Sequence, residues 1–173
     1  MLNAIKSAIR TVPNFPKPGI QFKDITPLLS DHKLLRYAVD SLASDWKDAG
    51  VTKVIGIESR GFILGAMLAD TLNVGFVPVR KQGKLPFTTI RETYDLEYGS
   101  DSIEMHIDAL TEQDVVLIHD DVIATGGTAA ATHRLVEFAG ATVAGYSFII
   151  DLSFLNGRSK LDPDLPFSTL VRY

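Results

Sequence analysis

Residues 115–128 read VVLIHDDVIATGGT. The run at 114–118 is typical of a buried strand, and it leads to two adjacent acids, Asp120 and Asp121, before a loop of small residues and a helical pattern. Strands of near-continuous hydrophobicity occur in parallel sheets covered on both faces, and ligands of such sheets bind outside the carboxyl ends of the strands. The stretch therefore predicts an α/β fold and puts the two acids at the edge where a ligand would bind.

The small residues after the acids suit a phosphate group. They offer closely spaced backbone N–H groups, two hydroxyls and the N-terminus of a helix, whose dipole favours an anion. The lysine of a Walker loop is missing, so the pattern does not indicate hydrolysis of a nucleoside triphosphate. The positions of this predicted phosphate loop are Ala124, Thr125, Gly126, Gly127 and Thr128.

Two acids beside a phosphate site would repel the anion unless the phosphate is attached to a sugar. Asp120 and Asp121 can then accept hydrogen bonds from the 2- and 3-hydroxyls of a ribose, and one of them can contact the water shell of a Mg²⁺ ion. Both would also stabilise positive charge on the ribose ring while a group departs from C1. We therefore expect the pair to have ribose-binding and catalytic roles.

The rest of the chain shows the same alternation of strand and helix. The clearest helix spans 31–49, where apolar residues recur at helical spacing before Gly50. This alternation predicts one domain, 1–173, with a central parallel sheet flanked by helices. Further strands are expected at 53–57, 75–79 and 143–150, and further helices at 62–72 and 128–138.

Three segments depart from this alternation. Polar sequence between 79 and 114 predicts a loop followed by a small antiparallel excursion. The proline-rich stretch 13–27 and the tail 157–166 are expected to be loops, with 163–166 as a covering segment of no assigned role.

Composition limits the classes of function. The chain has 173 residues, of which 46% are hydrophobic and 22% charged, as in a soluble globular domain with a sizeable core. The 17 basic and 21 acidic side chains give 17 − 21 = −4, which argues against a broad nucleic-acid-binding face. The absence of cysteine excludes disulfides and thiolate metal sites. Short apolar runs and the lack of a signal-peptide core predict no membrane association and a cytoplasmic location.

Four further motifs lie around the 115–128 segment. Taken together, all five resemble the type I phosphoribosyltransferase family, and in particular its adenine-specific branch, over about 12–150. The resemblance implies a glycosyltransferase that converts adenine and 5-phosphoribosyl 1-pyrophosphate (PRPP) into AMP and pyrophosphate in purine salvage. It also implies Mg²⁺ as cofactor and a homodimer. The four motifs are FPKPGIQFKDITPLL at 15–29, GIESRGFILG at 56–65, VPVRKQGKLP at 77–86 and ETYDLEYG at 92–99.

The resemblance implies where the base binds. Adenine would lie in an N-terminal hood, 1–30, against Phe22, with its Watson–Crick edge at backbone groups of Gln21 and Lys23. A carbonyl that accepts from the 6-amino group and an N–H that donates to N1 would select adenine, because a 6-oxo purine would leave buried groups unpaired.

The resemblance also implies residues for the leaving group and for proton transfer. Glu97 is similar to the catalytic carboxylate of the family, which takes or relays a proton from adenine. It lies in a loop, 80–99, that would close over the site. Mg²⁺ would be carried mainly by PRPP, with a water-mediated contact to Asp120, and a non-proline cis peptide is expected near Glu58–Ser59. The residues expected at pyrophosphate are Arg60, Arg80, Lys81 and Lys84.

Two alternatives remain at this point. One is a phosphoribosyltransferase for hypoxanthine, xanthine or orotate, against which the motifs at 15–29 and 92–99 argue. The other is a regulator that binds PRPP without catalysis, although the chain shows no basic helix of a DNA-binding domain. The four histidines show no metal-ligand spacing, and His119 stands where the family usually has an apolar residue. The segment 87–89 also departs from the family pattern.

Overall fold

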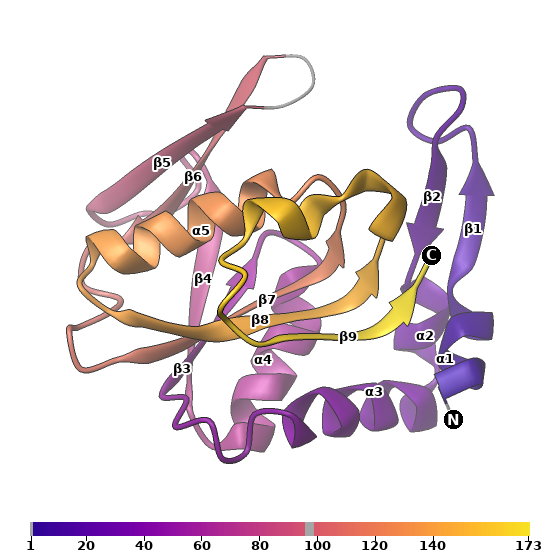
Figure 1. Ribbon diagram of the computed structural model, residues 1–173, viewed down its shortest axis with the longest axis horizontal. Helices are drawn as coiled ribbons and strands as arrows, with labels where there is room; N and C mark the ends of the chain where they lie inside the picture. The colour runs from indigo at the N-terminus through magenta and orange to yellow at the C-terminus, as the bar shows by residue number, and fades with distance from the viewer. Residues whose placement is uncertain (1, 96–98) are drawn as a thin grey trace.

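A mixed sheet forms the centre of the computed structural model, which describes residues 2–95 and 99–173 (Figure 1). Within these residues the sheet has seven strands in the order β5-β6-β4-β3-β7-β8-β9. The strands from β4 to β9 along this order pair in parallel, whereas β6 pairs antiparallel with both β4 and β5. The strands are β3 (Lys53–Ile57), β4 (Gly75–Lys81), β5 (Thr89–Asp95), β6 (Ser100–His106), β7 (Val115–Ile123), β8 (Thr142–Asp151) and β9 (Phe167–Arg172).

Helices cover both faces of this sheet. In Figure 1, α3 (His32–Ser44) and α4 (Gly61–Leu72) lie on one face, and α5 (Gly127–Phe138) lies on the other. The alternation of side chains along a strand explains why β7 serves both layers: Leu117 packs in the α3–α4 core and Ile118 in the α5 core, and both are fully buried. The predicted α/β class, with a helix-flanked sheet, is confirmed.

The N-terminal segment forms a small unit of its own. It contains α1 (Leu2–Ala8), the antiparallel pair β1 (Arg10–Pro13) and β2 (Gln21–Asp24), and α2 (Thr26–Ser30). Asp24 fixes the base of the hairpin, because its carboxylate accepts hydrogen bonds from the Thr26 N–H at 2.9 Å and from Arg10. In Figure 1 this hairpin and the β5–β6 hairpin stand on either side of the carboxyl end of β7.

Several predicted boundaries were wrong. The helix expected at 31–49 ends at Ser44, and turns lead on to Gly50, which does have a left-handed φ of +67°. The strand expected at 114–118 continues to Ile123, so both acids lie inside β7. The stretch 13–27 contains β2 and the start of α2 rather than loop alone.

The tail is also more ordered than its sequence suggests. Two short 3₁₀ helices, η1 (Ser153–Leu155) and η2 (Gly157–Lys160), lead to β9, which adds to the edge of the sheet parallel to β8. Residues 163–166 connect η2 to this strand, and Leu165 packs against the core on the α5 side of the sheet.

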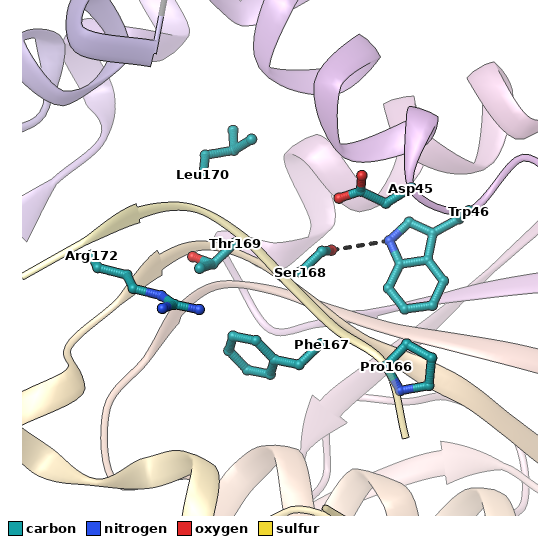
Figure 2. A pocket seen from close by; sticks show the side chains of 8 residues that line it. All are labelled: Asp45, Trp46, Pro166, Phe167, Ser168, Thr169, Leu170 and Arg172. Carbon is teal, nitrogen blue, oxygen red and sulfur yellow. Dashed lines mark hydrogen bonds between the residues drawn. The ribbon is translucent and has the colours of Figure 1, made fainter. Parts of the chain in front are cut away.

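A buried polar contact fixes β9 to the region after α3. The indole N–H of Trp46 donates to the Ser168 hydroxyl at 3.1 Å, as Figure 2 shows beside the hollow along β9. Trp46 also packs where Gly145 of β8 has no side chain, since a Cβ there would overlap the indole ring. The position of β9 therefore depends on residues more than 100 positions earlier in the chain, as the 122-residue separation of this contact shows.

Replacement of Ser168 by alanine should leave the buried indole N–H without its acceptor. We expect Ser168→Ala to lower the free energy of unfolding by about 1–3 kcal/mol, the usual penalty for such a group. Urea unfolding followed by tryptophan fluorescence measures the change. Ser7→Ala, at an exposed position of α1, is the matched control. Equal stability of the two variants would contradict the assigned role of this contact.

Candidate active site

A cleft of about 760 Å³ lies at the carboxyl ends of the parallel strands, bordered by the N-terminal hairpin. A smaller hollow of about 90 Å³ adjoins it at the start of α5, where Gly126, Gly127 and Thr128 contribute to the lining. The cleft thus brings together segments that are far apart in the sequence. The predicted site residues that line it are Gln21, Phe22, Lys23, Arg60, Asp120, Asp121, Ala124 and Thr125.

The two acids of β7 differ in their surroundings. Asp121 is buried, and its Oδ2 lies 2.8 Å from Nε of Arg60, an ion pair without the alignment of a hydrogen bond. Asp120 is partly exposed to the cleft, and its Oδ1 accepts the Asp121 N–H at 2.8 Å. Burial and the neighbouring Asp121 carboxylate raise the pKa of Asp120 well above its ordinary value. Burial also raises the pKa of Asp121, while Arg60 opposes that shift.

The loop after the acids turns sharply into α5. Gly126 has a left-handed φ of +76° and is the N-cap residue of the helix, which glycine tolerates at little steric cost. No side chain caps the first turn of α5. Its leading N–H groups therefore point toward the small hollow as donors for an anion, and the helix dipole adds to that preference.

Glu58 binds basic residues at the end of β4 and in the loop that follows it. Its carboxylate accepts from Arg80 Nε at 3.2 Å, from the Lys81 N–H at 3.0 Å and from the Lys84 ammonium. Burial opposes ionisation, but Lys84, the Lys81 N–H and Arg80 outweigh it and hold the pKa of Glu58 below its ordinary value. Glu58 lines the cleft, whereas Arg80, Lys81 and Lys84 line neither hollow. The ammonium of Lys81 pairs with Asp101 at 3.0 Å.

The hairpin supplies an aromatic wall. The ring of Phe22 packs edge-on against Phe15, with centroids 5.1 Å apart, and the Arg60 guanidinium lies 4.8 Å above the Phe22 ring. The Lys23 ammonium is turned elsewhere, because it donates to the Thr11 hydroxyl at 2.9 Å and lies 3.7 Å over the Tyr173 ring. The backbone is therefore the part of Lys23 that can meet a ligand.

Comparison with known proteins identifies the family to which the chain belongs. The chain matches the phosphoribosyl transferase domain over residues 29–168. It is 55% identical to an adenine phosphoribosyltransferase from Maricaulis maris, over 98% of this chain and 97% of that one. The chain belongs to the adenine phosphoribosyltransferase family.

Solved structures of the family share the whole fold. The crystal structure of the adenine phosphoribosyltransferase from Rhodothermus marinus superposes with a TM-score of 0.96, at 60% identity over 99% of this chain and 98% of that chain. The enzyme from Trypanosoma brucei, in complex with AMP, pyrophosphate and ribose-5-phosphate, gives a TM-score of 0.90 at 29% identity over 99% and 79%.

The wall opposite the hairpin was not predicted from the sequence. Leu152, Phe154 and Leu155 follow β8 and line the cleft, and Val122 joins them from β7. Phe154 is 70% exposed and forms the outer part of this apolar wall. Ligands bind at the carboxyl ends of parallel strands, and a strand was expected at 143–150. This rule could therefore have indicated that the residues just after 150 line the site.

Three other predictions have different outcomes. The cis peptide expected from the family resemblance is found between Glu58 and Ser59. His119 is fully buried, with Nδ1 3.3 Å from the Ser147 hydroxyl, and burial lowers its pKa to about 4, so it is neutral at pH 7. Glu97 lies outside the described residues, and its role stays a prediction.

The acid pair is also the place where the residues fit a metal ion. In the parts of the chain that the structure describes, no three acidic or histidine side chains converge as a metal cage. Mg²⁺ commonly uses only one or two carboxylates when substrate phosphates supply further ligands, and Asp120 with Asp121 matches that donor set. Within the same residues, no helix has the length and apolar character needed to span a membrane.

Asp120 should destabilise the ligand-free protein. A carboxyl whose pKa is raised by folding binds its proton more tightly in the folded state than in the unfolded state. The free energy of unfolding therefore falls as the pH rises above 3.8, the pKa of an aspartate in an unfolded chain. We expect Asp120→Asn to raise the free energy of unfolding, and more at pH 7 than at pH 5, because the amide is neutral at both. Urea unfolding at the two pH values measures this.

Asp108→Asn is the control, since Asp108 is exposed and lies away from the cleft. A lower stability of Asp120→Asn than of wild type at pH 7 would show that the carboxylate stabilises the fold.

Proposed function

We propose that the chain transfers the phosphoribosyl group of PRPP to N9 of adenine, giving AMP and pyrophosphate, in purine salvage. The observation that supports this best is the order of groups along one cleft: an aromatic and apolar base pocket, then the acid pair, then the uncapped start of α5. A nucleoside monophosphate has its base, ribose and 5-phosphate in the same order. We further propose that the chain acts as one domain, with 1–30 as base hood and 80–99 as catalytic loop.

Adenine would lie between Phe22 of the hairpin and the apolar wall of Leu152 and Leu155. The face of the base then contacts aromatic and aliphatic groups, while its Watson–Crick edge meets the backbone of Gln21 and Lys23. A backbone carbonyl that accepts from the 6-amino group would select adenine, because hypoxanthine has a carbonyl in place of that donor. Val122 would close the floor of the pocket.

Asp120 and Asp121 would hold the ribose hydroxyls. As pyrophosphate departs from C1, positive charge develops on the ribose ring, and the two carboxylates would stabilise it. The Arg60–Asp121 ion pair favours the ionised form of the second carboxylate, which is the form that can stabilise that charge. The proposed catalytic contribution of the pair is therefore electrostatic and depends on its fixed position rather than on a covalent step.

Pyrophosphate would be taken by Arg60 and by the basic residues beside Glu58, which are Arg80, Lys81 and Lys84. The 5-phosphate would accept the N–H groups of the phosphate loop, residues 124–128. Asp120 would meet a Mg²⁺ ion through water; such an ion, when bound with PRPP, neutralises charge on the departing pyrophosphate. Competition between pyrophosphate and Glu58 for the same cations would favour release of the product.

The remaining parts of the proposal rest on the family resemblance. Glu97 would take or relay the proton that adenine loses as N9 attacks C1. The loop 80–99 would close over the site and exclude water, which otherwise would hydrolyse PRPP. A homodimer in the cytoplasm would be the working form, with the partner subunit contributing to the pyrophosphate site.

Turnover with different bases tests the proposed function. We expect the protein with PRPP and Mg²⁺ to use adenine with a kcat/KM at least about 10³ times that for hypoxanthine, because unpaired buried groups penalise the 6-oxo base. Release of pyrophosphate in a coupled assay measures both rates, and omission of Mg²⁺ should lower them. Preference for hypoxanthine would reassign the base specificity. Binding of PRPP without pyrophosphate release for any base would favour the regulator instead.

Loss of the Phe22 ring should weaken the binding of adenine and leave the binding of PRPP unchanged. We expect Phe22→Ala to raise the KM for adenine about tenfold, since stacking a base on an aromatic ring contributes about 1–3 kcal/mol. The KM for PRPP should stay within about twofold of wild type. Steady-state kinetics with each substrate varied in turn gives both values. Phe138→Ala, at a highly exposed ring at the end of α5, is the control. Equal increases in both constants would contradict a base-stacking role.

A further inference from the structure

The first residue of η2 lies directly against the phosphate loop. A Cβ built on Gly157 would come far closer than 3.0 Å to the Ala124 carbonyl oxygen and within 2.9 Å of the Gly126 nitrogen. The reverse also holds, because a Cβ on Gly126 would overlap the carbonyl oxygen of Gly157. The two backbones therefore touch at a place where neither has room for a side chain.

The contact, and not a special backbone conformation, is what requires glycine at 157. Gly126 has a positive φ, but Gly157 does not belong to the glycines with positive φ. An alanine at 157 could adopt the same dihedral angles, yet its methyl group would meet backbone atoms, which cannot turn aside as a flexible side chain can. The phosphate loop or η2 would have to move by about 1 Å to restore ordinary van der Waals separation.

The η2 side of this contact is firmly anchored. The Arg158 guanidinium lies 4.0 Å over the Phe167 ring of β9, and Leu161 is buried in the α5 core. The Asp162 N–H donates to the Tyr146 hydroxyl of β8 at 3.3 Å. Because η2 is held to β8 and β9 at these points, the phosphate loop is the part expected to move when a methyl group is inserted.

We propose that Gly157 is a positioning residue for the ribose 5-phosphate, through its contact with the phosphate loop. The inference rests on the proposed function, in which residues 124–128 bind that phosphate. The backbone of Gly157 sets how deep the loop lies, and so where its N–H groups converge. Displacement by about 1 Å weakens such convergent hydrogen bonds severely, since about 1 Å of misplacement can reduce activity about 10²-fold.

Gly157→Ala tests the proposal. We expect the KM for PRPP to rise at least about tenfold while kcat at saturating PRPP changes less than about threefold. Calorimetric titration should show the same loss for ribose 5-phosphate, whereas the Kd of inorganic pyrophosphate stays within about twofold of wild type. A general loss of structure would weaken both ligands, so this split separates positioning from folding.

Gly75→Ala is the matched control. It is also a glycine without positive φ, and a Cβ there would meet only the flexible side chain of Lys53, at the end of β4 away from the cleft. We expect wild-type kinetics and wild-type ribose 5-phosphate binding for this variant. An unchanged PRPP KM in Gly157→Ala, or equal losses for ribose 5-phosphate and pyrophosphate, would overturn the proposal.

A second variant covers the case in which Gly157→Ala does not fold. Arg158→Ala removes the stacking on Phe167 and loosens η2 without adding atoms at the loop. It should raise the PRPP KM about two- to fivefold with kcat unchanged, and an unchanged KM would again overturn the proposal. If wild type binds ribose 5-phosphate but transfers the phosphoribosyl group of PRPP to no base, the proposed function fails, while the binding comparison still decides the role of Gly157.

Discussion

The ion pair between Arg60 and Asp121 joins the segments from which the cleft is built. Arg60 precedes α4, Asp121 belongs to β7, and the same guanidinium lies over the Phe22 ring of the hairpin. A buried carboxylate needs a partner, because an isolated charge away from water is strongly unfavourable. The need of Asp121 for a cation therefore fixes the start of α4 against the central strand and brings the N-terminal hairpin to the same point. Without that constraint, the base wall and the acid pair would have no defined separation.

The basic side chains around the cleft are paired with acids of the same chain. Arg60 pairs with Asp121, Arg80 and Lys84 with Glu58, and Lys81 with Asp101. The net charge of −4 therefore conceals local pairs of opposite charge, of which Arg60–Asp121 and Glu58 line the cleft. Because each of these cations is held by a carboxylate, the proposed pyrophosphate site would need less reorganisation than one built from unpaired lysines. Such preorganised charge is the form of electrostatic stabilisation that is most effective in a site poor in water.

The sequence predicted the parts of the site that are continuous in the chain. Strand, acids, loop and helix at 115–138 follow one another, so hydrophobic pattern and turn chemistry were enough to find them. Other features depend on contacts between distant residues. β9 owes its place to Trp46 and Gly145, and its own six residues show too little periodicity to predict a strand. The partnership of Glu58 with Lys84 joins two loops, and no local pattern indicates it. Leu155 received no role from the sequence, because its place in the cleft with Phe22 depends on the fold.

The short segment after β8 explains why the proposed base and phosphate sites would keep a fixed distance. Leu155 lines the cleft beside Phe22 and the other residues of the proposed base pocket, and Gly157, two positions later, contacts the loop 124–128. Both ends of this segment are held to the sheet, since the Ser153 N–H donates to the Tyr173 carbonyl at 3.0 Å and Arg158 stacks on Phe167. Tyr173 in turn lies under Lys23 of the hairpin. A shift of β9 would therefore reach the hood, the apolar wall and the phosphate loop together. The edge strand β9, which sequence patterns did not predict, thus connects the hood, the apolar wall and the phosphate loop. These parts must keep fixed relative positions if adenine is to reach C1 of the ribose phosphate.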